Sequence, residues 1–282
     1  MKLFSPTAEI FVPDGLNEDR ALARTTHMAI AAHQDDIEIM AAAPILDCFQ
    51  REDIWFSGVV VTDGRGSPRD DLYQDYTDET MHRVRFKEQR KAAVIGEFAA
   101  QVMLDYPSKT IKAGSNQEPV IDIANLIKIS KPDYVYTHNL ADKHDTHVAV
   151  GLRAVAAIRS LPESERPKKL FGCEVWRDLD WLVDSDKVAF DLSTHENLQM
   201  ALLGVFDSQI CGGKRYDLAS MGRRKANATY FESHGVDSSQ GLSYGIDLTP
   251  LIVDPSLDIT IFVHEYIQRF SQDVEARIKR AG

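Results

Sequence analysis

The fold of this chain is indicated by one stretch of its sequence, Met28-Ala29-Ile30-Ala31-Ala32-His33-Gln34-Asp35-Asp36. Its first five residues are a short apolar run, which predicts a buried strand. Its last four are polar and predict a loop. Pro44 follows near the front of an apolar segment, and proline is tolerated in the first turn of a helix, so we expect a helix to begin near residue 42. The stretch therefore predicts a strand, a polar loop and a helix, in that order.

The same unit recurs along the chain. Further strands are expected at 55–61, 101–104, 134–136 and 170–176, and helices at 78–98, around 120–127 and at 145–160. Strands that alternate with helices predict a mostly parallel sheet covered by helices on both faces.

The rhythm changes after Trp176. We expect helices at 193–206, 218–231 and 262–280, with residues 233–256 punctuated by Gly, Ser and Pro. This predicts a smaller C-terminal α+β portion. We expect one domain over residues 1–282, in which 1–25 form a peripheral arm or strand, 26–176 the core, and 177–282 a part that covers the pocket.

Composition restricts the partners. The formal net charge is −11 and the pI is about 5.3, so nucleic acids and anionic membranes are poor partners. No apolar stretch resembles a signal peptide or a membrane span. The three cysteines have no paired spacing, which fits a reducing compartment. We expect a cytoplasmic protein without membrane insertion, and a homo-oligomer remains compatible with the sequence.

Polar clusters follow the predicted strands, where parallel sheets bind ligands. His33 and Asp36 are three residues apart after the first strand, and His144 and His147 are three apart after the fourth. Imidazoles and a carboxylate from two loops match a catalytic zinc site, which keeps one position for water. The alternative is that the acidic residues cap a helix and the histidines are polar surface residues.

These clusters resemble motifs of the PIG-L/LmbE-type N-acetylglucosaminyl deacetylases. The matching residues are Ala32-His33-Gln34-Asp35-Asp36, the helical set Arg85, Glu88, Ala92, Ala93 and Gly96, then Thr137-His138-Asn139 with His144-Asp145-Thr146-His147, and Ser208-Gln209. Gln34 stands where the family motif has proline, and Thr146 where it has aspartate. The resemblance implies a Rossmann-like zinc hydrolase that removes the acyl group from the nitrogen of an amino sugar.

The resemblance also implies roles for individual residues. His33, Asp36 and His147 would bind one Zn²⁺ per chain. Asp35 would be the general base, and His144 would protonate the leaving amine or stabilise the oxyanion.

Other residues are candidates for the surroundings of this site. By the resemblance, Asp63 and Arg85 would lie in the substrate-binding part, together with Arg65. Arginines bind carboxylate or phosphate well, so we expect Arg65 or Arg85 to face the pocket, and Arg69 to pair with Asp70 or Asp71. His138 and Asp145 are candidates to support the metal ligands from behind, and His234 and His264 are candidates for the pocket lining.

Three other functions compete with this interpretation. A dinucleotide-binding oxidoreductase is disfavoured, because the loop after the first strand lacks Gly-x-Gly-x-x-Gly and its two aspartates would repel a pyrophosphate. A metal-dependent hydrolase of another ester or phosphoester, and a non-catalytic binding protein on the same fold, both stay open. Iron or cobalt could replace zinc at such a site. The natural substrate is not encoded in a readable pattern.

Overall fold

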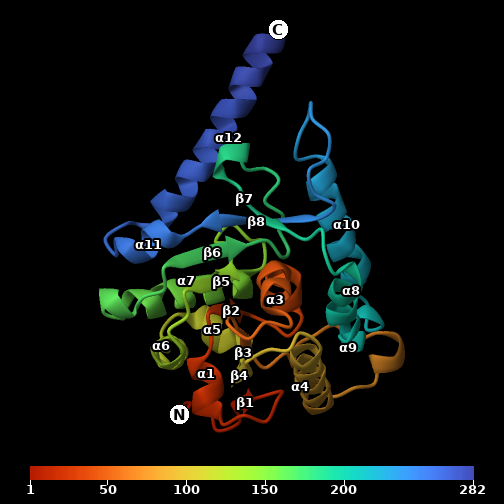
Figure 1. The fold of residues 1–282 in the computed structure, drawn as a ribbon, viewed down its shortest axis with the longest axis vertical. Helices are drawn as coiled ribbons and strands as arrows, with labels where there is room; N and C mark the ends of the chain where they lie inside the picture. The colour runs from red at the N-terminus through yellow and green to blue at the C-terminus, as the bar shows by residue number, and fades with distance from the viewer.

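One eight-stranded sheet runs through the computed structural model, which describes residues 1–282 (Figure 1). The strand order is β1-β4-β3-β2-β5-β6-β8-β7. The five central strands are parallel. They are β4 (Ala100–Tyr106), β3 (Phe56–Thr62), β2 (His27–Ala31), β5 (Tyr134–His138) and β6 (Lys169–Cys173). The predicted mostly parallel α/β fold is confirmed.

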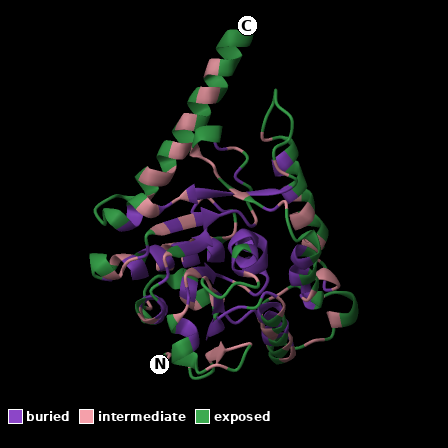
Figure 2. Cartoon of the chain, viewed as in Figure 1, coloured by how far each residue is buried: buried purple, intermediate pink, exposed green.

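The central strands are apolar because both faces of the sheet are covered. In β2, Met28 and Ile30 pack into one hydrophobic cluster, and Ala29 and Ala31 pack into another. Successive side chains of a strand point to opposite faces, so the two clusters lie on opposite sides of the sheet. Figure 2 shows the buried residues concentrated on these strands.

Helices divide between the two faces. The first face is covered by α1 (Glu18–Ala23), α5 (Ser108–Ala113), α6 (Glu118–Ser130), α7 (Asp145–Arg159) and α11 (Thr249–Val253). The second is covered by α2 (Asp36–Met40), α3 (Ala42–Cys48), α4 (Asp78–Ile95) and α8 (Glu196–Gly204). Two further helices, α9 (Asp207–Ile210) and α10 (Tyr216–Thr229), follow α8.

The sheet contains more strands than the sequence predicts. At one edge β1 (Glu9–Phe11) pairs antiparallel with β4, which places the N-terminal segment as a peripheral strand. At the other edge β8 (Leu242–Asp247) and β7 (Val188–Asp191) add two antiparallel strands. The sequence did not predict β7 or β8, because both are short and flanked by Gly, Ser and Asp. These strands extend the core sheet and do not cover the pocket.

The loop expected before residue 42 contains the short helix α2, whose five residues are all buried. Asp35 precedes it with φ of 87°, a backbone conformation that aspartate adopts more readily than most residues. The sharp turn at Asp35 lets the chain enter the helix directly from β2.

The C-terminal helix α12 (Ile259–Ala281) has no buried residue and extends away from the body of the molecule (Figures 1 and 2). No helix of the chain is both long and apolar enough to cross a membrane.

Candidate active site

The candidate site lies at the carboxyl ends of β2 and β5, which are neighbours in the sheet. From β2 the chain continues toward β3 on one side, and from β5 toward β6 on the other. Loops that leave adjacent strands in opposite directions open a crevice, which is where open α/β sheets bind ligands. His33 and Asp36 follow β2, and His147 stands in the first turn of α7 after β5.

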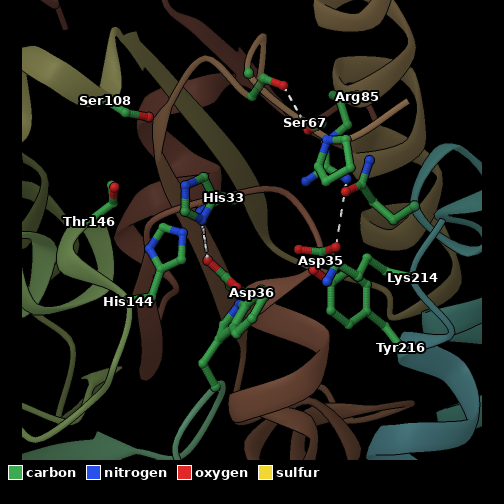
Figure 3. A pocket seen from close by; sticks show the side chains of 15 residues that line it. His33, Asp35, Asp36, Ser67, Arg85, Ser108, His144, Thr146, Lys214 and Tyr216 are labelled. Atoms are coloured by element: carbon green, nitrogen blue, oxygen red, sulfur yellow. Dashed lines mark hydrogen bonds and ion pairs between the residues drawn. The ribbon is translucent and has the colours of Figure 1, made fainter. Parts of the chain in front are cut away.

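Three side-chain atoms converge in this crevice. The Asp36 Oδ2 atom lies 3.1 Å from His33 Nδ1 and 3.4 Å from His147 Nε2, and the two nitrogens are 3.3 Å apart. At a tetrahedral zinc ion with bonds of about 2.0–2.1 Å, ligand atoms are separated by about 3.3 Å. The triangle has that size, and its donors are those that zinc accepts. These three residues therefore fit a single metal ion. Figure 3 shows His33 and Asp36 facing each other in the cavity.

Asp36 is held as an anion. Its carboxylate accepts the backbone N–H of His33 at 2.7 Å. Burial by itself would raise the pKa of Asp36, but the surrounding imidazoles, His147 first among them, outweigh burial and lower it. A carboxylate that stays ionised is the form that binds a metal.

Asp142 positions His147 from behind. Its Oδ2 atom lies 3.6 Å from His147 Nδ1, and its carboxylate accepts the backbone N–H groups of His144 at 2.9 Å and Trp176 at 3.1 Å. A carboxylate behind a ligating imidazole sets its orientation and its basicity. Asp142 was not predicted from the sequence, although its place two residues before His144 is a readable signal.

His138 connects the two loops that carry these side chains. Its Nε2 atom accepts the backbone N–H of Ala32 at 2.8 Å, and its ring stacks on His147 with centroids 4.0 Å apart. Burial, followed by the neighbouring His147, lowers the pKa of His138 well below its usual value. His138 is therefore held in the neutral form and packs against the ring of His147.

Asp35 points away from Asp36, toward Arg85. Its Oδ2 atom lies 3.6 Å from Arg85 Nη1, and Figure 3 shows the two side chains facing each other at the cavity. Burial raises the pKa of Asp35 to about 7, against the opposing effect of Arg85. Its side chain forms no capping hydrogen bond with α2. Adjacent carboxylates thus have separate surroundings, one among imidazoles and one beside a guanidinium.

His144 lies on the other side of the metal ligands. Its ring is 5.1 Å from that of His33 and 4.5 Å from that of His147, centroid to centroid. Burial and the neighbouring His147 lower the pKa of His144 to about 4. Thr146, where the family motif has aspartate, also lines the cavity, and no hydrogen bond is formed by His144 Nδ1.

A cavity of about 460 Å³ opens onto these groups. Most of its lining residues are not hydrophobic, and many of them come from segments far away in the sequence. The further lining residues are Gly64, Gly66, Ser67 and Pro68 after β3, Ser108 at the start of α5, Trp176 after β6, and Gln209, Lys214 and Tyr216 around the turn between α9 and α10.

Comparison with known proteins identifies the core. Residues 28–158, just under half of the chain, match the family model of PIG-L, the GlcNAc-PI de-N-acetylase. Over these residues the chain is similar to the PIG-L family, as the motifs in its sequence indicate. No curated protein matches the chain by sequence.

Several solved structures share the fold of this chain. GalB, the 4-carboxy-2-hydroxymuconate hydratase of Pseudomonas putida, is 14% identical with a TM-score of 0.64, over 79% of this chain and 96% of GalB. The conserved protein TT1542 of Thermus thermophilus is 18% identical with a TM-score of 0.61, over 83% of this chain and 99% of its own. N,N'-diacetylchitobiose deacetylase of Pyrococcus horikoshii is 16% identical with a TM-score of 0.58, over 77% of this chain and 82% of its own.

Of the two arginines expected at the substrate, one lines the cavity and the other does not. Arg85 lines the cavity and is almost completely buried. Arg65 lies outside the lining, where its guanidinium pairs with Asp63 at 3.3 Å and with Glu79. Asp63 is thus engaged with Arg65 and is not part of the cavity wall either.

Four other expectations are corrected. Arg69 pairs with Asp78 at 2.5 Å, at the start of α4, and not with Asp70 or Asp71. Asp145 is exposed at the start of α7, and because helical side chains at adjacent positions diverge, it does not share the cavity with Thr146. His234 and His264 are exposed, in the loop after α10 and on α12 respectively, and neither lines the cavity.

Proposed function

We propose that this protein is a zinc-dependent N-deacetylase that acts on an N-acetylglucosaminyl-type amino sugar or a related small molecule. The observation that carries the proposal is the triangle of His33, Asp36 and His147 donor atoms, with a separate buried carboxylate, Asp35, on the same cavity. A metal site with an adjacent free base is what hydrolysis of an amide by water requires.

His33, Asp36 and His147 would hold the metal. A divalent ion there would supply Lewis acidity, polarising the acyl carbonyl and making water a stronger acid. Two imidazoles and one carboxylate also suit iron or cobalt.

Asp35 would accept the proton of the attacking water. It lines the cavity, and it does not belong to the triangle of metal donors. Arg85 holds its carboxylate in place at 3.6 Å. Its pKa of about 7 lies near neutrality, where a general base works best.

His144 would act on the leaving group from the opposite side of the metal ligands. Its ring lines the cavity and contacts the rings of His33 and His147. A neutral imidazole donates a hydrogen bond through one nitrogen, so His144 can steady the developing oxyanion. The proton that the leaving amine needs would be the one that Asp35 takes from the attacking water, handed on directly or relayed through the free nitrogen of His144.

A hydratase is the second candidate. The fold neighbour GalB is a hydratase according to its name, and hydration also needs a base and an activated water. Hydration has no leaving amine. Deacetylation is favoured because residues 28–158 match the family model of a de-N-acetylase, whereas GalB shares the fold at 14% identity.

The test is a screen of N-acetylated amino sugars with zinc-loaded protein, in which free amine is measured with fluorescamine. The control is the Asp35→Asn variant loaded with the same zinc. Release of amine by the wild type, and its loss in the control, is the expected result. Hydration of 4-carboxy-2-hydroxymuconate, with no amine released from any acetylated sugar, would replace the deacetylase with a hydratase.

A further inference from the structure

The turn between α9 and α10 carries Lys214 to the cavity wall. Its backbone N–H donates to the carbonyl of Gln209 at 2.8 Å, and its own carbonyl accepts the N–H of Tyr216 at 2.8 Å. A Cβ atom at Gly212 would lie 1.8 Å from the carbonyl oxygen of Ser208, so the turn closes this tightly only with glycine. Lys214 therefore stands on a closely packed turn.

This turn is fastened to the core of the site. The backbone N–H and the hydroxyl of Ser208 both donate to the buried Glu88 carboxylate at 2.7 Å. Tyr73 donates its hydroxyl to Asp207 at 2.6 Å. The Ser208 bonds join the segment before Lys214 to α4, the helix that also supplies Arg85 to the cavity.

Lys214 differs from the arginines around the cavity in having no counter-ion. Each of those arginines is paired with a carboxylate of the chain: Arg85 with Asp35, Arg65 with Asp63 and Glu79, Arg69 with Asp78, and Arg215 with Asp217. Lys214 lines the cavity and forms no salt bridge, in a protein whose net charge is −11. An ammonium group that is partly removed from water and left unpaired gains most from an anionic ligand.

Trp176 connects Lys214 to the reacting groups. The Lys214 Nζ atom lies 5.2 Å from the centre of a Trp176 ring, within the range of a cation–π contact. The Trp176 ring centroid is 5.6 Å from that of His144. A molecule that lies along this indole would have one end at the metal ligands and the other at Lys214.

We propose that Lys214 binds an anionic group, a carboxylate or a phosphate, on the substrate. The inference rests on the proposed function and narrows its substrate class to an acylated amine that carries a negative charge at the end away from the acyl group. Arg85 does not take this role, because it is engaged with Asp35 and with the backbone carbonyl of Gln34. Although Arg85 Nε and Nη1 form no hydrogen bond, the charge of Arg85 is balanced by Asp35 and its side chain is almost completely buried. Lys214 is thus the specificity-determining residue in this proposal.

The test measures binding of deacylated products, which need no turnover. Glucosamine, glucosamine 6-phosphate and muramic acid are titrated into zinc-loaded wild-type protein by calorimetry, and then into Lys214→Gln and Lys214→Arg. Lys225→Gln is the matched control, because Lys225 is exposed on α10 and pairs with Glu196 at 3.0 Å. This substitution removes one positive charge from a residue that does not line the cavity. Thermal unfolding checks that every variant is folded.

We expect glucosamine 6-phosphate or muramic acid to bind at least about tenfold more tightly than glucosamine. Lys214→Gln should abolish most of that preference, while Lys214→Arg and Lys225→Gln keep it. The anionic probe that shows the preference identifies phosphate or carboxylate. Equal affinity for all three probes in the wild type, no binding of either anionic probe, or an unchanged preference in Lys214→Gln overturns the proposal.

The same protein is assayed for turnover of the three N-acetylated forms. An anionic preference in binding without any amine release would leave the Lys214 subsite standing and reject the deacetylase. Amine release from N-acetylglucosamine without an anionic preference in binding would support the deacetylase and reject the Lys214 subsite.

Discussion

Exchanging either of two adjacent carboxylates for its amide should separate the metal binding proposed for Asp36 from the catalysis proposed for Asp35. Asp36→Asn and Asp35→Asn each remove one charge and keep the shape of the side chain. Asparagine also tolerates the positive φ of 87° at position 35, whereas alanine would add backbone strain there. The two variants differ only in whether the lost oxygen faces the imidazoles or Arg85.

The expected magnitudes follow from those surroundings. Asp36 Oδ2 lies within 3.5 Å of three imidazole nitrogens, those of His33, His138 and His147, so its loss removes an anionic donor from the centre of the cluster. Loss of an outer-shell partner costs about 10–100-fold in metal affinity, and loss of a direct ligand should cost more. Asp35→Asn should retain the metal and lose about 10²–10⁴-fold in kcat, or about 3–5 kcal/mol of barrier.

Folding stability provides an independent check on Asp35. Burial outweighs Arg85 and raises the pKa of Asp35 to about 7. In metal-free protein, the folded state therefore holds this proton at a higher pH than the unfolded chain does, and ionisation costs stability as pH rises from about 4 through 7. With a chelator at pH 8, Asp35→Asn should unfold at a temperature no lower than the wild type does.

The assays are zinc content by elemental analysis, competition with a chelator for zinc affinity, and amine release at saturating substrate. Added zinc should partly restore Asp36→Asn and should not restore Asp35→Asn. The reasoning is refuted if Asp35→Asn turns over normally, or if Asp36→Asn binds zinc as tightly as the wild type.

Further variants test other parts of the site. Asp142→Ala should weaken zinc binding about 10–100-fold, because the carboxylate that orients His147 is lost; equal affinity in a chelator competition would contradict this. Arg65→Gln should change kcat/KM less than about threefold, because its guanidinium lies outside the cavity, and a larger loss would show that it reaches the substrate. Gly212→Ala should destabilise the fold by about 1–3 kcal/mol in urea unfolding, because its Cβ would clash with backbone. Its control, Gly222→Ala within α10, has open space around the added methyl group and should stabilise the fold by about 0.5–1 kcal/mol.

The parallel core of this protein could be predicted from local patterns in the sequence. Mostly apolar runs such as 28–32 and 55–61 can be recognised as strands because a strand buried on both faces has no position that faces solvent. His33, Asp36 and His147 were also accessible, since they directly follow strands whose carboxyl ends meet at one edge of the sheet. Each of these residues can be recognised from the sequence around it. Only the order of the strands in the sheet is needed in addition to place them together.

The surroundings of that site depend on tertiary contacts. The separate directions of Asp35 and Asp36 depend on a positive φ and on which partners lie within reach, and adjacency in the sequence encodes neither. Lys214 reaches the cavity from a turn whose position depends on bonds to α4, more than a hundred residues earlier. Arg65 was expected to face the pocket because of its place in the loop. In the structure its guanidinium pairs with Asp63 and Glu79 instead. Side-chain direction and long-range contacts are set by packing of the whole chain, so no local pattern records them.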